Sequence, residues 1–262
     1  MARPVGSITR GTTAHNRLRR SDRWIAAAHG ALLRGADRPL VVDLGYGASH
    51  ATTLELFTRL RRIRPDVEVT GLEIDPARVA LAKPYERPGL SFALGGFELP
   101  VPRPPVLVRA FNVLRQYDEA KAWHYWDVLC GALAPGGVLV EGTCSEVGHR
   151  AVWVGLSREG PRTLTFSARF DAFDRPSDLA DRLPKTLIHR NVPGERIHAF
   201  LRDFDRAWAV SAPYGAHGAR QRWLAAVAEL SGSWPVPRHP PLGGTARWRL
   251  GELTLPWAAV AP

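Results

Sequence analysis

The residues best suited to chemistry form a short turn, Asp43-Leu44-Gly45-Tyr46-Gly47, which ends an apolar run. Two glycines directly after a strand let the backbone turn tightly and approach a ligand, and a following helix offers its N-terminal amides. A carboxylate at Asp43 would repel a pyrophosphate but could pair with an ammonium group. The turn therefore favours a cationic, amino-acid-like ligand.

Turns that bind a dinucleotide share part of this sequence pattern. Dinucleotide-binding turns follow the spacing Gly-x-Gly-x-x-Gly, because the pyrophosphate lies against the start of the helix. Gly45 and Gly47 would then require a third glycine at the position of His50. An NAD(P)-dependent oxidoreductase with a Rossmann-type fold is the alternative hypothesis for the function.

The elements around the turn alternate between strands and helices. Apolar runs bounded by turn residues predict strands, and apolar residues at three- and four-residue spacing predict helices. The predicted strands cover residues 40–44, 67–72, 90–94, 106–111 and 138–141, and helices are predicted after caps at Ser21 and Ser49, over 76–83 and over 118–133. Five strands separated by helices or short crossovers imply a parallel sheet covered on both faces.

The pattern changes after residue 150. Residues 151–157 and 162–168 flank a turn composition that predicts a β-hairpin. Helices are predicted over 177–183, 195–208 and 220–230, followed by a loop over 231–244 and a last strand over 247–259. The predicted fold class is α/β, with a doubly wound, mainly parallel sheet, an added β-hairpin and C-terminal helices.

The turn around Asp43 resembles the first motif of the class I S-adenosylmethionine (SAM)-dependent methyltransferases, an acid followed by two glycines at this spacing. Residues 111–114 resemble the fourth motif of that family, and residues 134–140 resemble the turn into its fifth strand. The resemblance covers about residues 38–145. It implies a Rossmann-like methyltransferase fold, SAM as the cofactor, and direct displacement of the methyl group onto an acceptor.

The same resemblance implies which residues hold the cofactor. An acid that ends the second strand accepts both ribose hydroxyls in this family, and Glu73 occupies that place. Where the family usually has an acid for the adenine amino group, this chain has Gly96, so adenine recognition is expected from backbone groups, from stacking on Phe97, or from Glu98 by a different route. The cofactor candidates are Asp43, Gly45, Tyr46, Gly47, Glu73, Ile74, Gly96, Phe97 and Asn112.

The sequence indicates catalytic and substrate-binding residues less clearly than cofactor-binding ones, because displacement by an oriented nucleophile requires few protein groups. Asn112 could contact the cofactor or end a strand, Tyr117 could line the pocket or pack in the core, and His189 could act as a general base. The substrate candidates are Thr12, Arg17, Arg115, Arg190 and Asn191; Asn191 could instead cap the next helix.

Three parts are expected along the chain. Residues 1–20 form a basic arm, which is either a lid over the cofactor or a solvated terminus. Residues 21–150 form the SAM-binding α/β core, and residues 151–262 form a substrate-side elaboration of the same domain.

The charge and composition of the chain indicate which classes of acceptor it could bind. The net charge is +10, and the first 23 residues contain six arginines and one aspartate, which makes RNA a possible acceptor. Because all but three of the 35 basic residues are arginine, part of the bias is compositional, and a small metabolite is the other possible acceptor.

Several classes of protein are disfavoured. No apolar run has the length of a bilayer span, and the N-terminus lacks the hydrophobic core of a signal peptide, so a cytoplasmic protein without membrane attachment is expected. Cys130 and Cys144 are too few for a disulfide scaffold or a cysteine zinc site, and the histidines show no metal-ligand spacing. We therefore expect reduced, structural cysteines and no metal.

Overall fold

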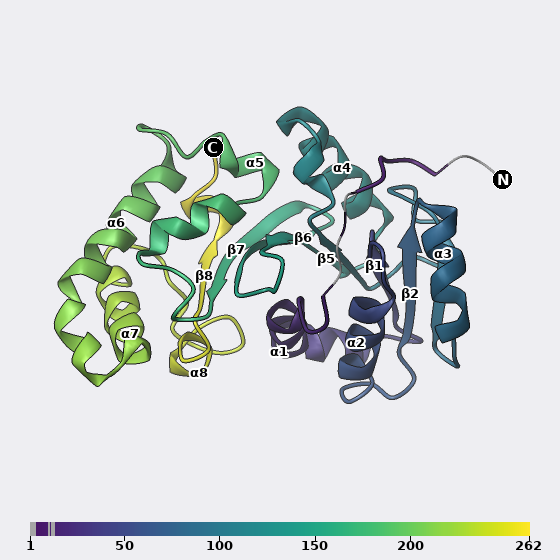
Figure 1. Ribbon diagram of the computed structural model, residues 1–262, viewed down its shortest axis with the longest axis horizontal. Helices are drawn as coiled ribbons and strands as arrows, with labels where there is room; N and C mark the ends of the chain where they lie inside the picture. The colour runs from purple at the N-terminus through teal and green to yellow at the C-terminus, as the bar shows by residue number, and fades with distance from the viewer. Residues whose placement is uncertain (1–3, 10, 12–13) are drawn as a thin grey trace.

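The described strands form one eight-stranded sheet in the order β3-β2-β1-β4-β5-β6-β7-β8. The computed structural model describes residues 4–9, 11 and 14–262 (Figure 1). The strands are β1 (Leu40–Leu44), β2 (Glu68–Glu73), β3 (Leu90–Leu94), β4 (Leu107–Phe111), β5 (Val138–Cys144), β6 (Arg150–Ser157), β7 (Gly160–Ala168) and β8 (Glu252–Pro256). Strands β1 to β5 pair in parallel, and β6, β7 and β8 extend the sheet by antiparallel pairing.

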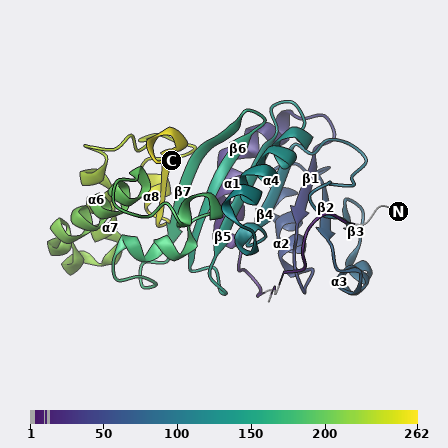
Figure 2. The ribbon, with the colours of Figure 1, turned by 90° about the horizontal axis from the view of Figure 1, so that it is seen from above.

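Helices cover both faces of the sheet (Figures 1 and 2). They are α1 (Arg19–Gly35), α2 (Ala51–Leu60), α3 (Pro76–Ala82), α4 (Glu119–Ala132), α5 (Lys185–Ile188), α6 (Arg196–Val210), α7 (Ala219–Leu230) and α8 (Thr245–Trp248). Short 3-10 turns include Leu114–Gln116 after β4 and Pro176–Arg182 before α5. In Figure 1, α1 and α2 lie below the sheet and α4 lies above it, while α6 and α7 lie at the end opposite to α3.

The core forms because successive residues of a buried strand face opposite sides of the sheet. Val41 packs with Trp24 and Ile25 of α1, whereas Val42 packs in a second cluster with Trp126 of α4. That second cluster continues into α6 and α7, which include the fully buried Trp223. The parallel and antiparallel halves of the sheet therefore share one hydrophobic layer.

The predicted fold class is confirmed, including the hairpin of β6 and β7 and the C-terminal helices. Helices predicted over 76–83 and 118–133 are observed as α3 and α4, each begun by an aspartate whose side chain accepts a backbone N–H: Asp75 from Ala77 and Asp118 from Lys121. These caps satisfy amide groups that have no partner inside the helix.

Four local predictions were wrong. Helix α1 begins at Arg19, so Ser21 lies inside it and its hydroxyl donates to the Leu18 carbonyl instead of capping. His50, rather than Ser49, occupies the N-cap position of α2, although the Ser49 hydroxyl accepts the N–H of Ala51, the first residue of the helix, at 3.3 Å.

Near the C-terminus, the single strand predicted over 247–259 is divided between α8 and the shorter β8. Asn191 does not cap α6, whose N-cap is Glu195; its side chain instead contacts His198. Among the residues described, no helix combines the length and apolar character required to cross a membrane.

Candidate cofactor and acceptor site

A cavity of about 670 Å³ opens where the strand order reverses, at the carboxyl ends of β1 and β4. In doubly wound sheets, ligands bind in the crevice at this switch point, because the chain leaves neighbouring strands in opposite directions. The cavity is lined by Thr9, Gly11, Arg17, Leu18, Asp43, Leu44, Gly45, Tyr46, Gly47, Thr52, Phe111, Asn112, Arg115, Gln116, Cys144, Glu146 and Arg182.

The glycine turn has the backbone geometry that its residues predict. Gly45 and Gly47 have φ angles of +68° and +83°, in the left-handed region that favours glycine. A Cβ atom at Gly45 would lie 2.7 Å from Cγ2 of Val113, so the turn also needs glycine for space. Between the two glycines, Tyr46 points into the core, where its ring packs edge-on against Phe92.

Glu73 lies at the end of β2 beside this turn, with only 2% of its surface exposed. One carboxylate oxygen accepts the Gly47 N–H at 2.9 Å, and the other accepts the Ile74 N–H at 3.0 Å. Arg78 approaches the same carboxylate at 3.7 Å. The oxygen that accepts from Ile74 also accepts the Asp75 N–H at 3.4 Å, so the capacity of Glu73 for a ligand hydroxyl remains at the oxygen that accepts from Gly47.

Asp43 has a different environment from the one its spacing suggested. It is the register partner of Arg109 on β4, whose guanidinium donates to its two oxygens at 2.9 and 2.7 Å. Thr53 of α2 donates a further hydrogen bond at 2.6 Å. Both carboxylate oxygens are thus bound by the protein, and the ammonium-like partner of Asp43 is the buried Arg109.

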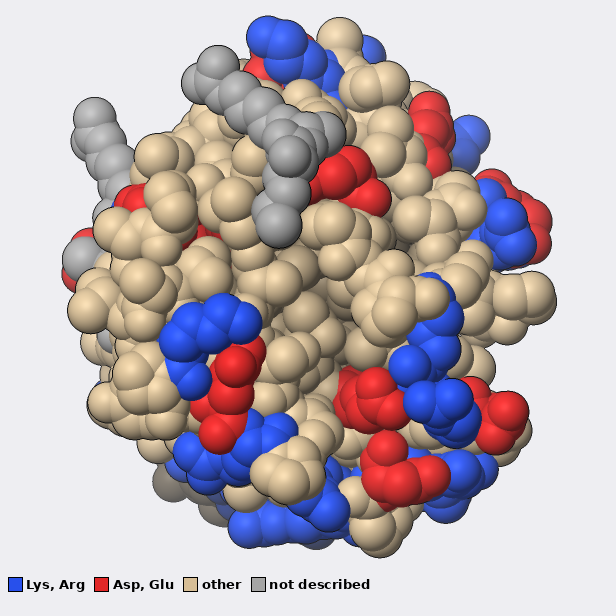
Figure 3. Space-filling view, turned by 90° about the vertical axis from the view of Figure 1, so that its right-hand side faces the viewer, with Lys and Arg blue, Asp and Glu red and all other residues tan. Residues whose placement is uncertain are grey.

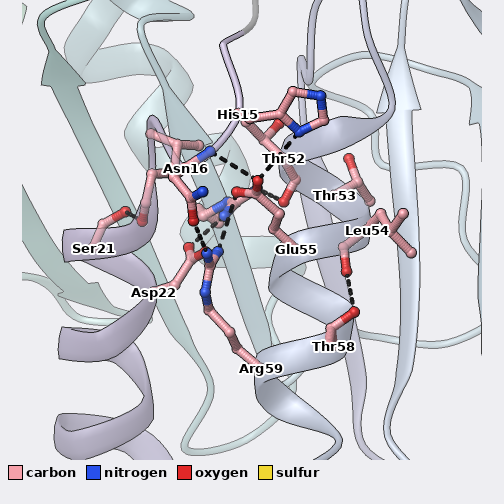
Figure 4. A network of polar contacts seen from close by, with 12 residues as sticks. His15, Asn16, Ser21, Asp22, Thr52, Thr53, Leu54, Glu55, Thr58 and Arg59 are labelled. Atoms are coloured by element: carbon pink, nitrogen blue, oxygen red, sulfur yellow. Dashed lines mark hydrogen bonds and ion pairs between the residues drawn. The ribbon is translucent and has the colours of Figure 1, made fainter. Parts of the chain in front are cut away.

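The same network ties the first two helices to the sheet (Figure 4). Arg109 also pairs with Asp22 of α1, and Arg59 of α2 donates to Asp22 at 2.5 Å and to Asn16 at 2.8 Å. Asp22 and Arg109 are both fully buried. Buried charges require such pairing, because each one alone would lose its hydration without compensation. The network therefore fixes the floor of the cavity beneath the glycine turn.

A narrow crevice runs from the cavity towards Glu73 and the end of β3, and the N-terminal segment 4–9 lies in it. The Val5 carbonyl accepts the Phe97 N–H at 3.0 Å, and the Val5 N–H donates to Glu98 at 2.8 Å. Farther along, the Ser7 N–H donates to the Tyr117 hydroxyl at 2.7 Å. With the segment in place, the crevice keeps about 20 Å³ of open space.

The crevice is built from the residues expected to recognise adenine, in a different arrangement. Gly96 leaves room for the segment, because a Cβ atom there would lie 2.0 Å from the Val5 carbonyl oxygen. The Phe97 ring stacks on Tyr125, with ring centroids 3.7 Å apart, and meets Tyr117 edge-on. Glu98 accepts the Gly96 N–H at 2.9 Å. Ile74 lies on the wall of the same crevice.

Asn112 lies on the opposite wall of the cavity, directly after β4. Its backbone has a φ of +61°, which is uncommon for a residue other than glycine. Its side chain accepts the Cys144 N–H at 3.0 Å and donates to the Cys144 sulfur at 3.3 Å, joining the ends of β4 and β5. Strained residues are often found at functional sites, where the surrounding structure holds them in place.

Among the described residues, three guanidinium groups line the cavity near these strand ends. Arg17 donates to the Ser145 carbonyl at 3.1 Å, Arg115 donates to the Asp181 carbonyl at 2.8 Å, and Arg182 contacts the Cys144 carbonyl at 3.4 Å. The sequence singled out Arg17 and Arg115 but missed Arg182. Sequence spacing offers no signal for Arg182, which comes from the distant Pro176–Arg182 turn.

Other predicted site residues lie elsewhere. None of His189, Arg190 and Asn191 lines the cavity or the crevice. The His189 ring contacts Lys185 at 3.0 Å, and Arg190 pairs with Glu119 of α4 at 2.9 Å, so these side chains connect surface elements. Thr12 lies outside the described residues. No cluster of three or more potential metal ligands occurs in the described part of the chain.

No family model and no curated protein matches the chain. Matching solved structures include human N-acetylserotonin methyltransferase in complex with SAM, at 26% identity, covering 44% of this chain and 33% of that one, with a TM-score of 0.33.

Two further matches have similar scores. A putative methyltransferase in complex with the Haloferax volcanii Trm112 activator is 22% identical over 49% of this chain and 52% of that one, with a TM-score of 0.36. A putative sarcosine dimethylglycine methyltransferase from Galdieria sulphuraria is 19% identical over 53% and 55%, with a TM-score of 0.36. The matched region spans about a third to a half of these proteins.

Proposed function

We propose that the chain is a SAM-dependent methyltransferase that binds its cofactor in the Glu73 crevice and its acceptor in the adjoining cavity. The observation that carries this proposal is the buried carboxylate of Glu73, which lies at the end of β2 and accepts the amide of the glycine turn at 2.9 Å. A carboxylate in this place suits a ligand with vicinal hydroxyls. The motif resemblance of residues 38–145 supports the same assignment.

The residues fit such a cofactor if segment 4–9 leaves the crevice. Glu73 would accept the ribose hydroxyls, and the backbone of Phe97 would meet the base at the place where it now meets Val5. Arg78 has a buried guanidinium nitrogen without a hydrogen-bond partner beside this site, which is consistent with a further polar group there. Asp43 would act indirectly, by holding the glycine turn through Arg109 and Thr53.

The geometry around the turn disfavours the oxidoreductase alternative. A pyrophosphate needs free amides in the glycine turn and at the start of the following helix, but the Gly47 amide of the turn already donates to Glu73. His50, in place of the third glycine, stacks on Tyr85 with centroids 3.4 Å apart. A second anionic group close to Glu73 would also meet electrostatic repulsion.

When bound, SAM supplies a methyl group on a positively charged sulfur. The contribution of this chain is to bind and orient the reactants and to exclude water, since direct displacement depends mainly on alignment. Asn112 would keep the ends of β4 and β5 together at the wall of the cavity. Tyr117 would act at the crevice, through its contact with Ser7, and His189 is not retained as a base because it lies outside the cavity.

We further propose that residues 4–9 form a cover that opens for the cofactor, and that residues 151–262 belong to the same domain as the core. RNA is not proposed as the acceptor. On the face at the α3 end of the molecule, acidic side chains lie next to many of the described basic ones, which gather mainly towards the lower edge of the view (Figure 3). Nucleic-acid sites normally present an uninterrupted basic patch.

A comparison of cofactors tests the proposal. Calorimetric titrations with SAM, with its demethylated product S-adenosylhomocysteine (SAH) and with NAD should give binding to the first two only. Incubation with methyl-labelled SAM and fractionated cell extract should then move the label to a small-molecule fraction. Binding of NAD without binding of SAH would overturn the proposal.

A further inference from the structure

We propose that the methyl acceptor is a small molecule with an anionic group, carboxylate or phosphate, which Arg115 and Arg182 bind at the wall of the cavity. This inference rests on the proposed function, because it assumes that the cavity holds the acceptor beside the cofactor.

The first support is the charge on the cavity wall. Besides Asp43, whose charge is matched by Arg109, the described lining residues include one acid, the exposed Glu146, and three arginines. Arg115 makes no ion pair with a described carboxylate, and its hydrogen bond goes to a backbone carbonyl. Because Arg182 shares the carboxylate of Asp181, Arg115 is the cation of this wall that an anionic ligand would neutralise.

The second support is the small number of described carboxylates that pair with the arginines on this side of the cavity. Asp181 is shared by Arg182 and Arg150, each with a nitrogen 3.0 Å from the same oxygen, and Arg115 holds the carbonyl of that residue. Two guanidiniums thus share one carboxylate, and a third, that of Arg115, lies against the backbone of the same residue. The pKa of Arg115 is lowered by burial and by the positive charge of Arg182, as expected for like charges held close together.

The third support is the separation of this wall from the cofactor crevice. Thr9, Leu44 and Gly45 line both spaces and mark their boundary. Arg115 and Arg182 line only the large cavity, and Glu73 lines only the crevice. A ligand anion at the arginines therefore belongs to a different part of the site from a ribose at Glu73. Planar guanidiniums suit carboxylate and phosphate groups, which they can bind through two hydrogen bonds.

Simple probes test this assignment. Benzoate, its neutral analogue benzamide, and inorganic phosphate are titrated by calorimetry into the full chain, both saturated with SAH and free of it. Benzoate or phosphate should bind the SAH-saturated protein at least about tenfold more tightly than benzamide does, because a hydrogen bond to a charged group contributes about 1.5–3 kcal/mol. Equal binding of benzoate, phosphate and benzamide would overturn the proposal.

Two substitutions locate the site. Arg115→Gln and Arg182→Gln should each weaken binding of the anion by about tenfold and change the affinity for SAH less than about twofold. Arg190→Gln is the matched control, because it removes a surface guanidinium paired with Glu119 outside the cavity. Tenfold weaker SAH binding in Arg115→Gln would instead assign the arginine to the carboxylate of the cofactor and overturn the inference.

Failure of the proposed function and failure of the small-molecule assignment would give different results. If SAH fails to bind the unaltered chain while benzoate still binds and depends on Arg115, the proposed function fails and the anion site stands by itself. If a short RNA displaces benzoate and accepts the methyl label when small acids do not, the small-molecule assignment is wrong. Persistence of anion binding at full strength in both arginine variants would also contradict it.

Discussion

Glu141 lies within β5, where only 2% of its surface is exposed and the indole N–H of Trp126 donates to it at 3.3 Å. Burial raises the pKa of the Glu141 carboxyl to about 8, and the hydrogen bond from Trp126 offsets only part of this effect. The folded protein therefore keeps this side chain largely protonated at neutral pH. This buried acid thus contributes to pH-dependent stability, although no part of the proposed function uses it.

Substitution of this acid tests that conclusion. Because the folded pKa is raised from 4.5 to about 8, the stability from protonated Glu141 is present at low pH and is lost as pH rises across that interval. Glu141→Gln should remove this pH-dependent fall in the free energy of unfolding, which amounts to at most roughly 1.4 kcal/mol per pH unit. Urea unfolding at about pH 5, 7 and 9 measures it. A constant difference between the two proteins would contradict the raised pKa.

Arg109 differs from Glu141 because it is buried in its charged form, paired with two carboxylates, Asp43 and Asp22. Arg109→Met would leave both carboxylates buried without their common cation, which should lower the free energy of unfolding by about 3–5 kcal/mol. Denaturant unfolding measures the change. Arg162→Met, which breaks an exposed pair with Glu159, is the control and should leave the midpoint unchanged. Equal effects in the two variants would contradict the structural role of the network.

At the scale of elements, segment 4–9 occupies the crevice in which the proposed cofactor would lie. It donates to Glu98 and Tyr117 and accepts from Phe97, so its backbone uses groups that a bound base would need. A ligand that binds there must displace it, and the free energy of those contacts reduces the apparent affinity. The arm was predicted as a possible lid, but its insertion beside Phe97 had no sequence signal.

Removal of the segment should therefore improve binding. A variant that lacks residues 1–9 should bind SAH several-fold more tightly, mainly through a faster association rate, as measured by stopped-flow fluorescence and calorimetry. Tyr117→Phe, which removes the hydrogen bond from Ser7, should produce a smaller change in the same direction. Weaker binding with faster dissociation in the truncated variant would mean that the segment closes over the ligand instead of competing with it.

The elements themselves could largely be predicted from periodicity. The alternation that predicted β1 to β5 reflects buried strands and amphipathic helices, and these patterns are local. Contacts between distant segments could not be predicted in this way. Arg109 lies in the apolar run of β4, and only the register of β4 against β1 places it beside Asp43. The glycine turn and Glu73 were predictable because their roles depend on strand ends, whereas Arg182 depends on how the C-terminal half folds back.

At the scale of the whole molecule, the sheet is continuous from β3 to β8, and one hydrophobic cluster joins α4 to α6 and α7. This continuity supports the proposal that residues 21–150 and 151–262 form one domain. Such a structure should unfold in one cooperative transition. Thermal unfolding followed by circular dichroism and by tryptophan fluorescence should give the same midpoint. Two separated transitions would show that the antiparallel half is an independent unit.

We propose that the crevice at the end of β2 binds SAM through Glu73. The most direct measurement is a calorimetric titration of SAH into the unaltered chain, Glu73→Gln and Glu68→Gln, the last of which changes an exposed acid at the start of the same strand. We expect binding to the unaltered chain and to Glu68→Gln, and at least about tenfold weaker binding to Glu73→Gln, because one acceptor for the ribose hydroxyls is lost. Equal affinity of Glu73→Gln and the unaltered chain, or no binding of SAH to either, would contradict the account.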